Sequence, residues 1–303
     1  MHNIPVLCVC ENSLAQAYEK ALVSLYTNGI SFKTQYDKPD DPPSRESTMD
    51  MTILDPLAEP MIHKAFPGGI EDLREYVMEL QGVKDHWVKN INDPKDTRWE
   101  YTYHGRLAAY GTWRELQKGM STVTGQFNID QVEAVINKLV AQPYTRQAQM
   151  ITWMPNLDLD CYDPPCLQSI WYRIIEDTDG IGWLNCNVRF RSNDAWGANF
   201  MNMFGFILFN RDIIAAEVAK RSGHTIKLGR LNWHADSYHI YGKDIANAKQ
   251  RLFDRMSTTD FSERVYEFTD PMIQEIYTEA EQTVRDKIKE FDARSTVGAR
   301  ECQ

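Results

Sequence analysis

The sequence lacks several features that would place it in a familiar class. It has no run of eighteen apolar residues, so no transmembrane helix is expected. Its amino-terminal stretch, MHNIPVLCVCENS, has no basic segment before the apolar run, which is typical of a first strand and not of a signal peptide. It has no GxxxxGKS or GxxxxGKT phosphate loop and no GxGxxG motif. We therefore expect a cytoplasmic protein that does not act at a membrane.

Cysteine and positive charge are also scarce. The six cysteines in 303 residues form no CxxC pair, so a disulfide scaffold is excluded and free thiols are expected. Cys8 and Cys10 would lie on one face of a strand, but without a second cysteine pair we predict no metal site. The 33 basic against 43 acidic residues give a net charge of -10, which argues against a nucleic-acid substrate. An anionic small substrate would need arginines gathered at one place.

The apolar patterns that are present predict an α+β protein. Residues 4–10 form a strand candidate, followed by a helix that Asn12 caps and Gly29 closes. The proline-rich segment DKPDDPPSREST, which contains Arg45, is expected to be an ordered surface loop. Further strands are expected at 48–55, 144–153 and 225–242, and helices at 70–81, 106–119, 129–141 and 196–221, with an irregular aromatic segment at 87–104.

No repeat, low-complexity segment or clear linker interrupts the chain. We therefore expect a single domain over residues 1–303, with a C-terminal helical extension from about residue 245 that ends in a polar tail, GARECQ.

One cysteine has a setting that suggests chemistry. Cys166 follows two prolines at the start of an apolar strand, and the next strand leads into Arg191-Ser192-Asn193-Asp194. The connection between the two strands, TDGIG, is typical of a hairpin, so Arg191 could lie near Cys166. A neighbouring cation lowers the pKa of a thiol and raises its nucleophilic thiolate fraction. A strand cysteine is more often a small core residue, and on these residues alone both interpretations stand.

Other polar residues could complete a site for a phosphorylated sugar and base. Arg45, Arg146 and Arg191 offer forked donors for a phosphate, although Arg45 could equally be a solvated loop residue. Glu75 and Tyr103 could move protons, although a carboxylate beside an apolar helix stripe is more often a rim charge. The remaining candidates that could bind a ligand are Ser192, Asn202, His239 and Tyr241.

Taken in order, these residues resemble the thymidylate synthase family. The resemblance covers about residues 40–245 and rests on the motifs DPPSR, EYVMELQG, YTYHGR, PPC, RSND and SYHIY, and several local features are similar to divergent, archaeal-type members. It implies one thymidylate-synthase-like domain, built as a large mixed sheet flanked by helices, in which a face of the sheet forms a homodimer interface.

The resemblance also implies roles for individual residues. Cys166 would add to C6 of a pyrimidine nucleotide, so that C5 captures a one-carbon unit from the co-substrate 5,10-methylenetetrahydrofolate. Glu75 would organise water, Tyr103 would assist removal of the C5 proton, and Asn202 would read the base. The remaining implied contacts are Arg45, Arg191, Ser192 and Arg146 of the partner subunit with the phosphate, His239 and Tyr241 with the ribose, and Asp194 and Trp99 with the folate.

Three departures from the family pattern bear on the product. Leu167 follows the cysteine where the best-known synthases have histidine, Gln147 replaces the second arginine of the interface pair, and the chain ends in a polar extension. In the family a short apolar terminus excludes water, and water exclusion decides between a methyl and a hydroxymethyl product. We expect dTMP synthesis from dUMP, since an amide at Asn202 suits uracil. The alternatives are a dUMP or dCMP hydroxymethylase and a non-catalytic nucleotide-binding regulatory homologue.

Overall fold

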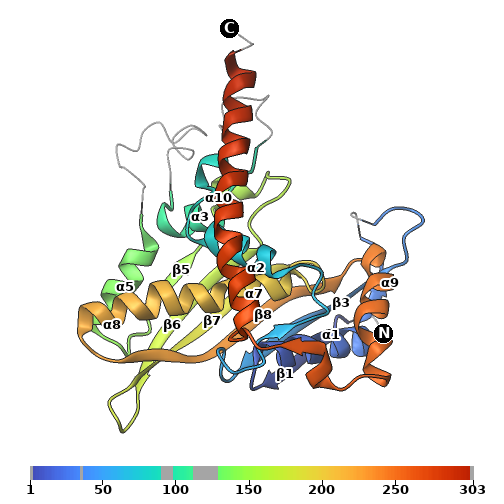
Figure 1. Cartoon of the computed structure of the whole chain (residues 1–303), viewed down its shortest axis with the longest axis horizontal. Coiled ribbons are helices and arrows are strands. Elements are labelled where there is room, and N and C mark those ends of the chain that lie inside the picture. Colours follow the sequence, from blue (N-terminus) through green and yellow to red (C-terminus); the bar gives the residue numbers. More distant parts are fainter. Residues whose placement is uncertain (1–2, 35–36, 90–97, 112–128, 301–303) are drawn as a thin grey trace.

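A mixed β-sheet forms the centre of the protein (Figure 1). The structure, a computed structural model, describes residues 3–34, 37–89, 98–111 and 129–300, with side chains to residue 293 at the C-terminal end. The seven-stranded sheet has the order β1-β3-β8-β7-β6-β5, with β2 beside β3. Its strands are β1 (Val6–Glu11), β2 (Ile30–Phe32), β3 (Ser44–Ile53), β5 (Gln149–Ile151), β6 (Leu167–Glu176), β7 (Gly182–Asp194) and β8 (Ile226–Ile240). A separate ribbon pairs β4 (Ile62–His63) with β9 (Val265–Tyr266).

The two faces of the sheet differ in burial. On β7 the side chains of Leu184 and Val188 are buried, whereas Asn185 and Arg189 on the opposite face are partly or fully exposed. Strands β3, β6 and β8 alternate in the same way over most of their lengths. The pairs β1–β3 and β7–β8 are parallel and the other described pairs are antiparallel. The mixed sheet and its helices confirm the α+β class expected from the sequence.

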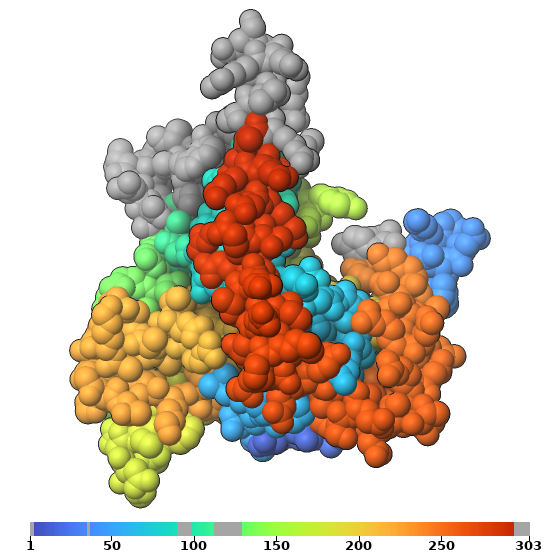
Figure 2. Space-filling view, in the orientation of Figure 1, coloured from blue at the N-terminus to red at the C-terminus, as the bar shows by residue number. Residues whose placement is uncertain are grey.

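Three helices are stacked on the buried face. α7 (Asn199–Phe209) lies against the sheet, where Phe206 contacts the rings of Phe190 and Trp233. α2 (Ile70–Leu80) packs on α7, and α10 (Pro271–Arg300) packs on α2. α10 crosses the middle of the molecule in Figure 2. A Cβ atom on Gly205 of α7 would lie 2.5 Å from the Tyr76 ring, so the glycine permits the close approach of α2. The other α-helices of the described residues are α1 (Leu14–Asn28), α3 (Tyr103–Ala108), α5 (Gln131–Ala141), α6 (Pro155–Asp158), α8 (Ala216–Ser222) and α9 (Ile245–Ala248).

Several predicted elements are confirmed. The hairpin of β6 and β7 turns at TDGIG, where Gly180 has φ +75° and Asp177 accepts hydrogen bonds from the turn backbone. α2 and α5 match the helices predicted at 70–81 and 129–141 within two residues. The helix predicted at 196–221 is α7 and α8, joined by a π-helical segment at Asn210–Ala215.

Other boundaries were wrong. The cap of α1 is Ser13, not Asn12, because Ser13 and Gln16 form a reciprocal capping box. The loop predicted around Arg45 ends earlier, since β3 already begins at Ser44 and pairs there with β2. The strand predicted at 144–153 is reduced to β5.

Parts of other predicted elements cannot be compared. Only α3 is seen of the helix predicted at 106–119, and residues 112–119 lie outside the described residues, as do 90–97 of the predicted aromatic loop. The expected polar tail is helical through Arg300, with 301–303 outside the described part. Among the described residues, no helix is both long enough and apolar enough to span a membrane.

Candidate functional site

Cys166 lies against Arg191 where the paired strands β6 and β7 meet. Arg191 Nη2 is 3.6 Å from Cys166 Sγ, and the Arg191 backbone N–H donates to the Cys166 carbonyl at 2.8 Å. The guanidinium also donates to the carbonyl oxygens of Pro164 at 2.6 Å and Pro165 at 3.0 Å. The two prolines therefore present acceptors that hold the arginine beside the thiol. The hairpin that the sequence predicted brings these two residues together.

Two opposing influences act on the Cys166 thiol. Burial raises its pKa, the positive charge of Arg191 opposes that rise, and the negative charge of Asp163 adds to it. The net direction is upward, so the arginine does not by itself make the resting thiol acidic. A further hydrogen-bond donor or positive charge close to the sulfur would lower the pKa of the thiol, whereas a phosphate close to it would raise this pKa.

Two tyrosines border Cys166. The Leu167 backbone N–H donates to Tyr103 Oη at 3.4 Å, which places the phenol one residue from the cysteine. Tyr101, whose ring centroid is 5.6 Å from that of Tyr103, also accepts a backbone hydrogen bond from Cys166. Burial raises the pKa of both phenols, so both stay neutral. Tyr101 was not among the residues predicted from the sequence, although the Y-T-Y spacing could have indicated it.

The register of β7 and β8 gathers most of the remaining predicted residues at the same end of the sheet. Ser192 pairs with Ser237, and Asp194 pairs with His239. Tyr241 follows the end of β8, and its ring centroid is 4.7 Å from that of His239. The residues that the resemblance assigns to the phosphate, the ribose and the folate thus lie on or directly after two adjacent strands, β7 and β8, beside Cys166.

His239 has a nitrogen available for a ligand. Its Nδ1 lies 3.2 Å from Ser237 Oγ and 3.3 Å from the Ser237 carbonyl, and in the tautomer that serves the carbonyl, which only accepts, Nδ1 carries the proton. Nε2 is then the acceptor, and it is buried without a hydrogen-bond partner among the described residues. A buried polar atom of this kind calls for an explanation, and a ligand hydroxyl would satisfy it.

Asp194 and Trp99, the expected folate contacts, differ in their surroundings. Asp194 Oδ1 accepts from the backbone N–H groups of Trp196 at 3.0 Å and Gly197 at 2.9 Å, and so fixes the turn before α7. Trp99 is 39% exposed and borders a cavity of about 260 Å³. The other residues that line this cavity are Glu79, Glu100, Tyr101, Thr102, Tyr103 and Asp163. Aromatic walls with carboxylates suit a flat heterocycle that carries N–H donors.

Two glutamates of α2, Glu75 and Glu79, share one lysine. Lys84 Nζ is 2.7 Å from Glu75 Oε1 and 3.3 Å from Glu79 Oε2, and Lys287 of α10 is 3.5 Å from Glu75 Oε2. Burial opposes ionisation of both carboxyls. For Glu75 burial is the largest single influence, but the hydrogen bonds and charges of Lys84 and Lys287 together outweigh it and lower the pKa, whereas burial dominates at Glu79 and raises its pKa. Glu79, which was not predicted from the sequence, is the glutamate that borders the cavity beside Tyr103.

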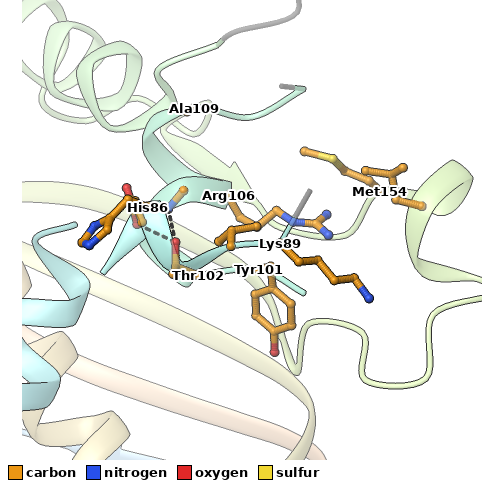
Figure 3. Close-up of a pocket in the computed structure, with 11 residues that line it drawn as sticks. His86, Lys89, Tyr101, Thr102, Arg106, Ala109 and Met154 are labelled. Carbon is orange, nitrogen blue, oxygen red and sulfur yellow. Dashed lines mark hydrogen bonds between the residues drawn. The ribbon is translucent and has the colours of Figure 1, made fainter. Parts of the chain in front are cut away.

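A second cavity, of about 320 Å³, lies on the α3 side of Tyr101 (Figure 3). Thr102, Lys89 and Arg106 line it, and Thr102 Oγ1 accepts from the Gly105 N–H at 2.9 Å. Arg106 forms a buried pair with Asp158 at 2.7 Å, so its guanidinium holds α6 in place. Cys166 does not line this cavity.

Asn202 is held in a buried polar network. Its Oδ1 accepts from Asn193 Nδ2 at 3.1 Å, and its Nδ2 donates to the Tyr76 phenol at 2.8 Å. Asn193 stands between Ser192 and Asp194 on β7, so Asn202 is tied to the strand that carries the RSND motif. Each of its amide atoms keeps one further hydrogen-bonding position.

The side chains of two predicted arginines, Arg45 and Arg146, make no described hydrogen bond to the site around Cys166. Leu167 is part of the core. Arg45 donates to Ser31 Oγ at 2.8 Å and to the Tyr26 carbonyl at 2.6 Å. Arg146 is exposed, and no described hydrogen bond joins its side chain to the site. Leu167 is fully buried, so the position after the cysteine faces the core.

The fold and the site define an α+β protein with a cysteine and an arginine at the end of a mixed sheet. A profile of the family described as thymidylate synthase matches residues 73–279, more than half of the chain. The chain therefore belongs to the thymidylate synthase family.

Named relatives and a solved structure agree with this assignment. A Methanocaldococcus jannaschii protein named "Putative thymidylate synthase" is 28% identical over 244 residues, which cover 78% of this chain and 91% of that protein. A protein of the same name from Methanopyrus kandleri is 30% identical over 171 residues, or 56% of this chain and 68% of that protein. The fold is similar to that of thermostable thymidylate synthase A from Bacillus subtilis, with a TM-score of 0.55, 18% identity and coverage of 80% and 84% of the two chains.

Proposed function

We propose that this protein is a thymidylate synthase that converts dUMP and 5,10-methylenetetrahydrofolate to dTMP and dihydrofolate. The contact between Arg191 and Cys166, in a chain of this family, carries the proposal. In the proposed reaction the Cys166 thiolate forms a C–S bond to C6 of the pyrimidine, and the electron pair of the C5–C6 double bond moves to C5. The same C–S bond breaks at the end of the cycle and returns the thiolate.

The chain's own residues would position the nucleotide and manage its protons. Arg191 and Ser192 would hold the phosphate, and His239 Nε2 would accept from a ribose hydroxyl. Because burial keeps the Tyr103 phenol neutral, it would orient the departing C5 proton or a water instead of acting as a phenolate base. The folate, when bound near Trp99 and Asp194, supplies the one-carbon unit and, for a methyl product, a hydride. The roles of Glu75 and Asn202 remain those that the resemblance implies.

We also propose a homodimer that uses the open face of the sheet. Along β6, Ile170 and Tyr172 are buried, whereas Trp171 and Arg173 on the other face are only partly so. Trp171 Nε1 donates to the Arg146 carbonyl at 3.1 Å, so Arg146 lies beside this face. An exposed arginine there supports a role at the phosphate site of the partner subunit, and Arg45 would complete that site only after its guanidinium leaves Tyr26 and Ser31. A single domain and a cytoplasmic location stay predictions.

A hydroxymethylase acting on dUMP or dCMP is the second candidate. The observation in its favour is the C-terminal helix, which brings charged residues toward α2 and the loop beside it. Lys287 pairs with Glu75, and Asp292 accepts from Trp87 Nε1 at 3.0 Å. A charged helix in place of an apolar terminus favours water at the one-carbon unit, and addition of water gives the hydroxymethyl product.

The test is incubation with each nucleotide and the folate, followed by product mass, since methyl and hydroxymethyl products differ by one oxygen. Incubation with 5-fluoro-dUMP and the folate is expected to trap a covalent adduct on Cys166. Cys166→Ser should abolish the adduct, and Cys161→Ser serves as the matched control at a nearby free thiol. Nucleotide binding with no adduct in the wild type would instead indicate the regulatory homologue.

A further inference from the structure

Asn202 belongs to a hydrogen-bonded network of five buried side chains in the core. Trp233 Nε1 donates to Asn193 Oδ1 at 3.1 Å, and Asn193 Nδ2 donates in turn to Asn202 Oδ1 at 3.1 Å. Asn199 Nδ2 donates to the same Asn193 oxygen at 2.6 Å, and Tyr238 donates to Asn199 Oδ1 at 3.0 Å. Trp233, Asn199 and Tyr238 are fully buried, so water does not compete for these bonds.

The direction of the hydrogen bonds in this network is set by one group that can only donate. An amide can present either its oxygen or its nitrogen, and its partners decide which. The Trp233 indole N–H has no acceptor function, so the Asn193 atom that faces it must be the oxygen. Asn193 then donates its N–H group to Asn202, and Asn202 must accept this hydrogen bond with its oxygen. The Asn202 nitrogen is left to face Tyr76, whose phenol accepts.

The orientation of the Asn202 amide matters because uracil and cytosine differ by an exchange of donor and acceptor, as the two orientations of an amide do. Uracil has a donor at N3 and an acceptor at O4, whereas cytosine has an acceptor at N3 and a donor at N4. An asparagine can satisfy either base, depending on which way its amide is turned.

We propose that Asn193 is a specificity-determining positioning residue, which fixes the amide of Asn202 in the orientation that accepts uracil and rejects cytosine. The inference rests on the proposed function, because it requires Asn202 to contact the base. It goes further by assigning the choice of base to a residue that does not itself touch the nucleotide, and by tracing that choice to an indole N–H in the core.

The experiment replaces the donor with an acceptor. In Asn193→Asp the carboxylate still accepts from Trp233 and Asn199 but cannot donate, so Asn202 should turn its N–H group toward it and its oxygen toward Tyr76. The ratio of kcat/KM for dUMP to that for dCMP is expected to fall by about tenfold to a hundredfold. Calorimetric dissociation constants for the two nucleotides should shift in the same sense without any need for turnover.

Tyr76→Phe is the matched control at the other end of the amide. It removes the acceptor for Asn202 Nδ2 but leaves the Asn193 donor in place, so both nucleotides should bind less tightly while their ratio stays within about twofold. If Asn193→Asp does not fold, Trp233→Phe removes the donor-only group. Asn193 is then oriented only by the Asn199 amide, which can itself turn because the Tyr238 hydroxyl can donate or accept, so the ratio should fall toward one.

The outcomes separate the two proposals. An unchanged ratio in folded Asn193→Asp, or in folded Trp233→Phe where that variant replaces it, would overturn the role of Asn193 while wild-type activity on dUMP upholds the proposed function. An equal shift in Tyr76→Phe would also overturn it. A wild type that binds neither nucleotide and forms no 5-fluoro-dUMP adduct would overturn the proposed function itself.

Discussion

Arg191 Nη2 lies 3.6 Å from Cys166 Sγ, while the same guanidinium donates to the carbonyls of Pro164 and Pro165. The arginine therefore fixes the backbone that carries the thiol and supplies the charge that opposes the effect of burial on it. A phosphate that binds Arg191 would act on the nucleophile through this contact. If Arg191 binds the substrate phosphate, as proposed, binding changes the charge beside the thiol through this one side chain.

Replacement of Arg191 by alanine is expected to raise the pKa of Cys166 further, because the influence that lowers it is lost while burial remains. Alkylation of Cys166 by iodoacetamide at pH 7 should slow by about tenfold, corresponding to about one pKa unit. The measurement is the alkylation rate against pH, read by peptide mass. Arg189→Ala is the matched control, since Arg189 is an exposed arginine of the same strand and pairs with Asp236 at 2.8 Å. Equal rates in all three proteins would contradict the role given to Arg191.

Glu75 and Glu79 should respond in opposite ways to replacement by glutamine. The lowered pKa of Glu75 means that its ionised form stabilises the fold, so Glu75→Gln should reduce stability at pH 7 by about 0.5 to 1 kcal/mol. The raised pKa of Glu79 means that ionisation costs stability as the pH rises through the folded-state value, so Glu79→Gln should not destabilise at pH 7. Urea unfolding of both variants gives the comparison. A loss in Glu79→Gln as large as that in Glu75→Gln would show that the two carboxyls are equivalent.

Glu19 should make the protein sensitive to acid. Burial opposes its ionisation, but hydrogen bonds from His63 and Arg264, each at 2.8 Å, outweigh burial and lower the pKa of Glu19 to about 2. The stabilisation is present above the unfolded-state pKa, near 4.5, and is lost as the pH falls through about 2. Glu19→Gln should cost about 3 kcal/mol at pH 7, since Arg264 stays buried without its ion pair.

Urea unfolding at pH 7 and pH 3 tests this prediction. The difference in unfolding free energy between the two pH values should be smaller in Glu19→Gln than in the wild type. The control, Glu71→Gln, changes an exposed carboxylate and is expected to stay within about 0.5 kcal/mol of the wild type. A pH dependence in Glu19→Gln that matches the wild type would rule out Glu19 as its source.

The proposed dimer can be tested at Trp171, on the open face of the sheet. Trp171→Glu places a charge where the second subunit would pack, so the variant should sediment as a monomer. Trp171→Phe keeps an aromatic ring and should remain dimeric. Analytical ultracentrifugation distinguishes these outcomes, and a monomeric wild type would count against the interface.

Local patterns in the sequence were sufficient to predict the hairpin that joins Cys166 to Arg191. Apolar alternation and a glycine-rich turn are short-range signals, and the register of the hairpin follows from them. The same signals failed at Arg45, because the pairing of β2 with β3 depends on residues more than ten positions apart. They also directed attention to Glu75 and not Glu79, since helical spacing alone does not say which carboxyl borders a cavity.

The sequence by itself determined the α+β class, the main helices and strands, and the ordered motifs that identify the family. These depend on periodicity and on residue types that are visible along the chain. Only the tertiary structure decided that Asn193 connects Trp233 to Asn202, that His239 keeps a buried nitrogen without a partner among the described residues, and that α10 packs on α2. The physical reason is that hydrogen-bond direction and burial depend on groups brought together from distant parts of the chain.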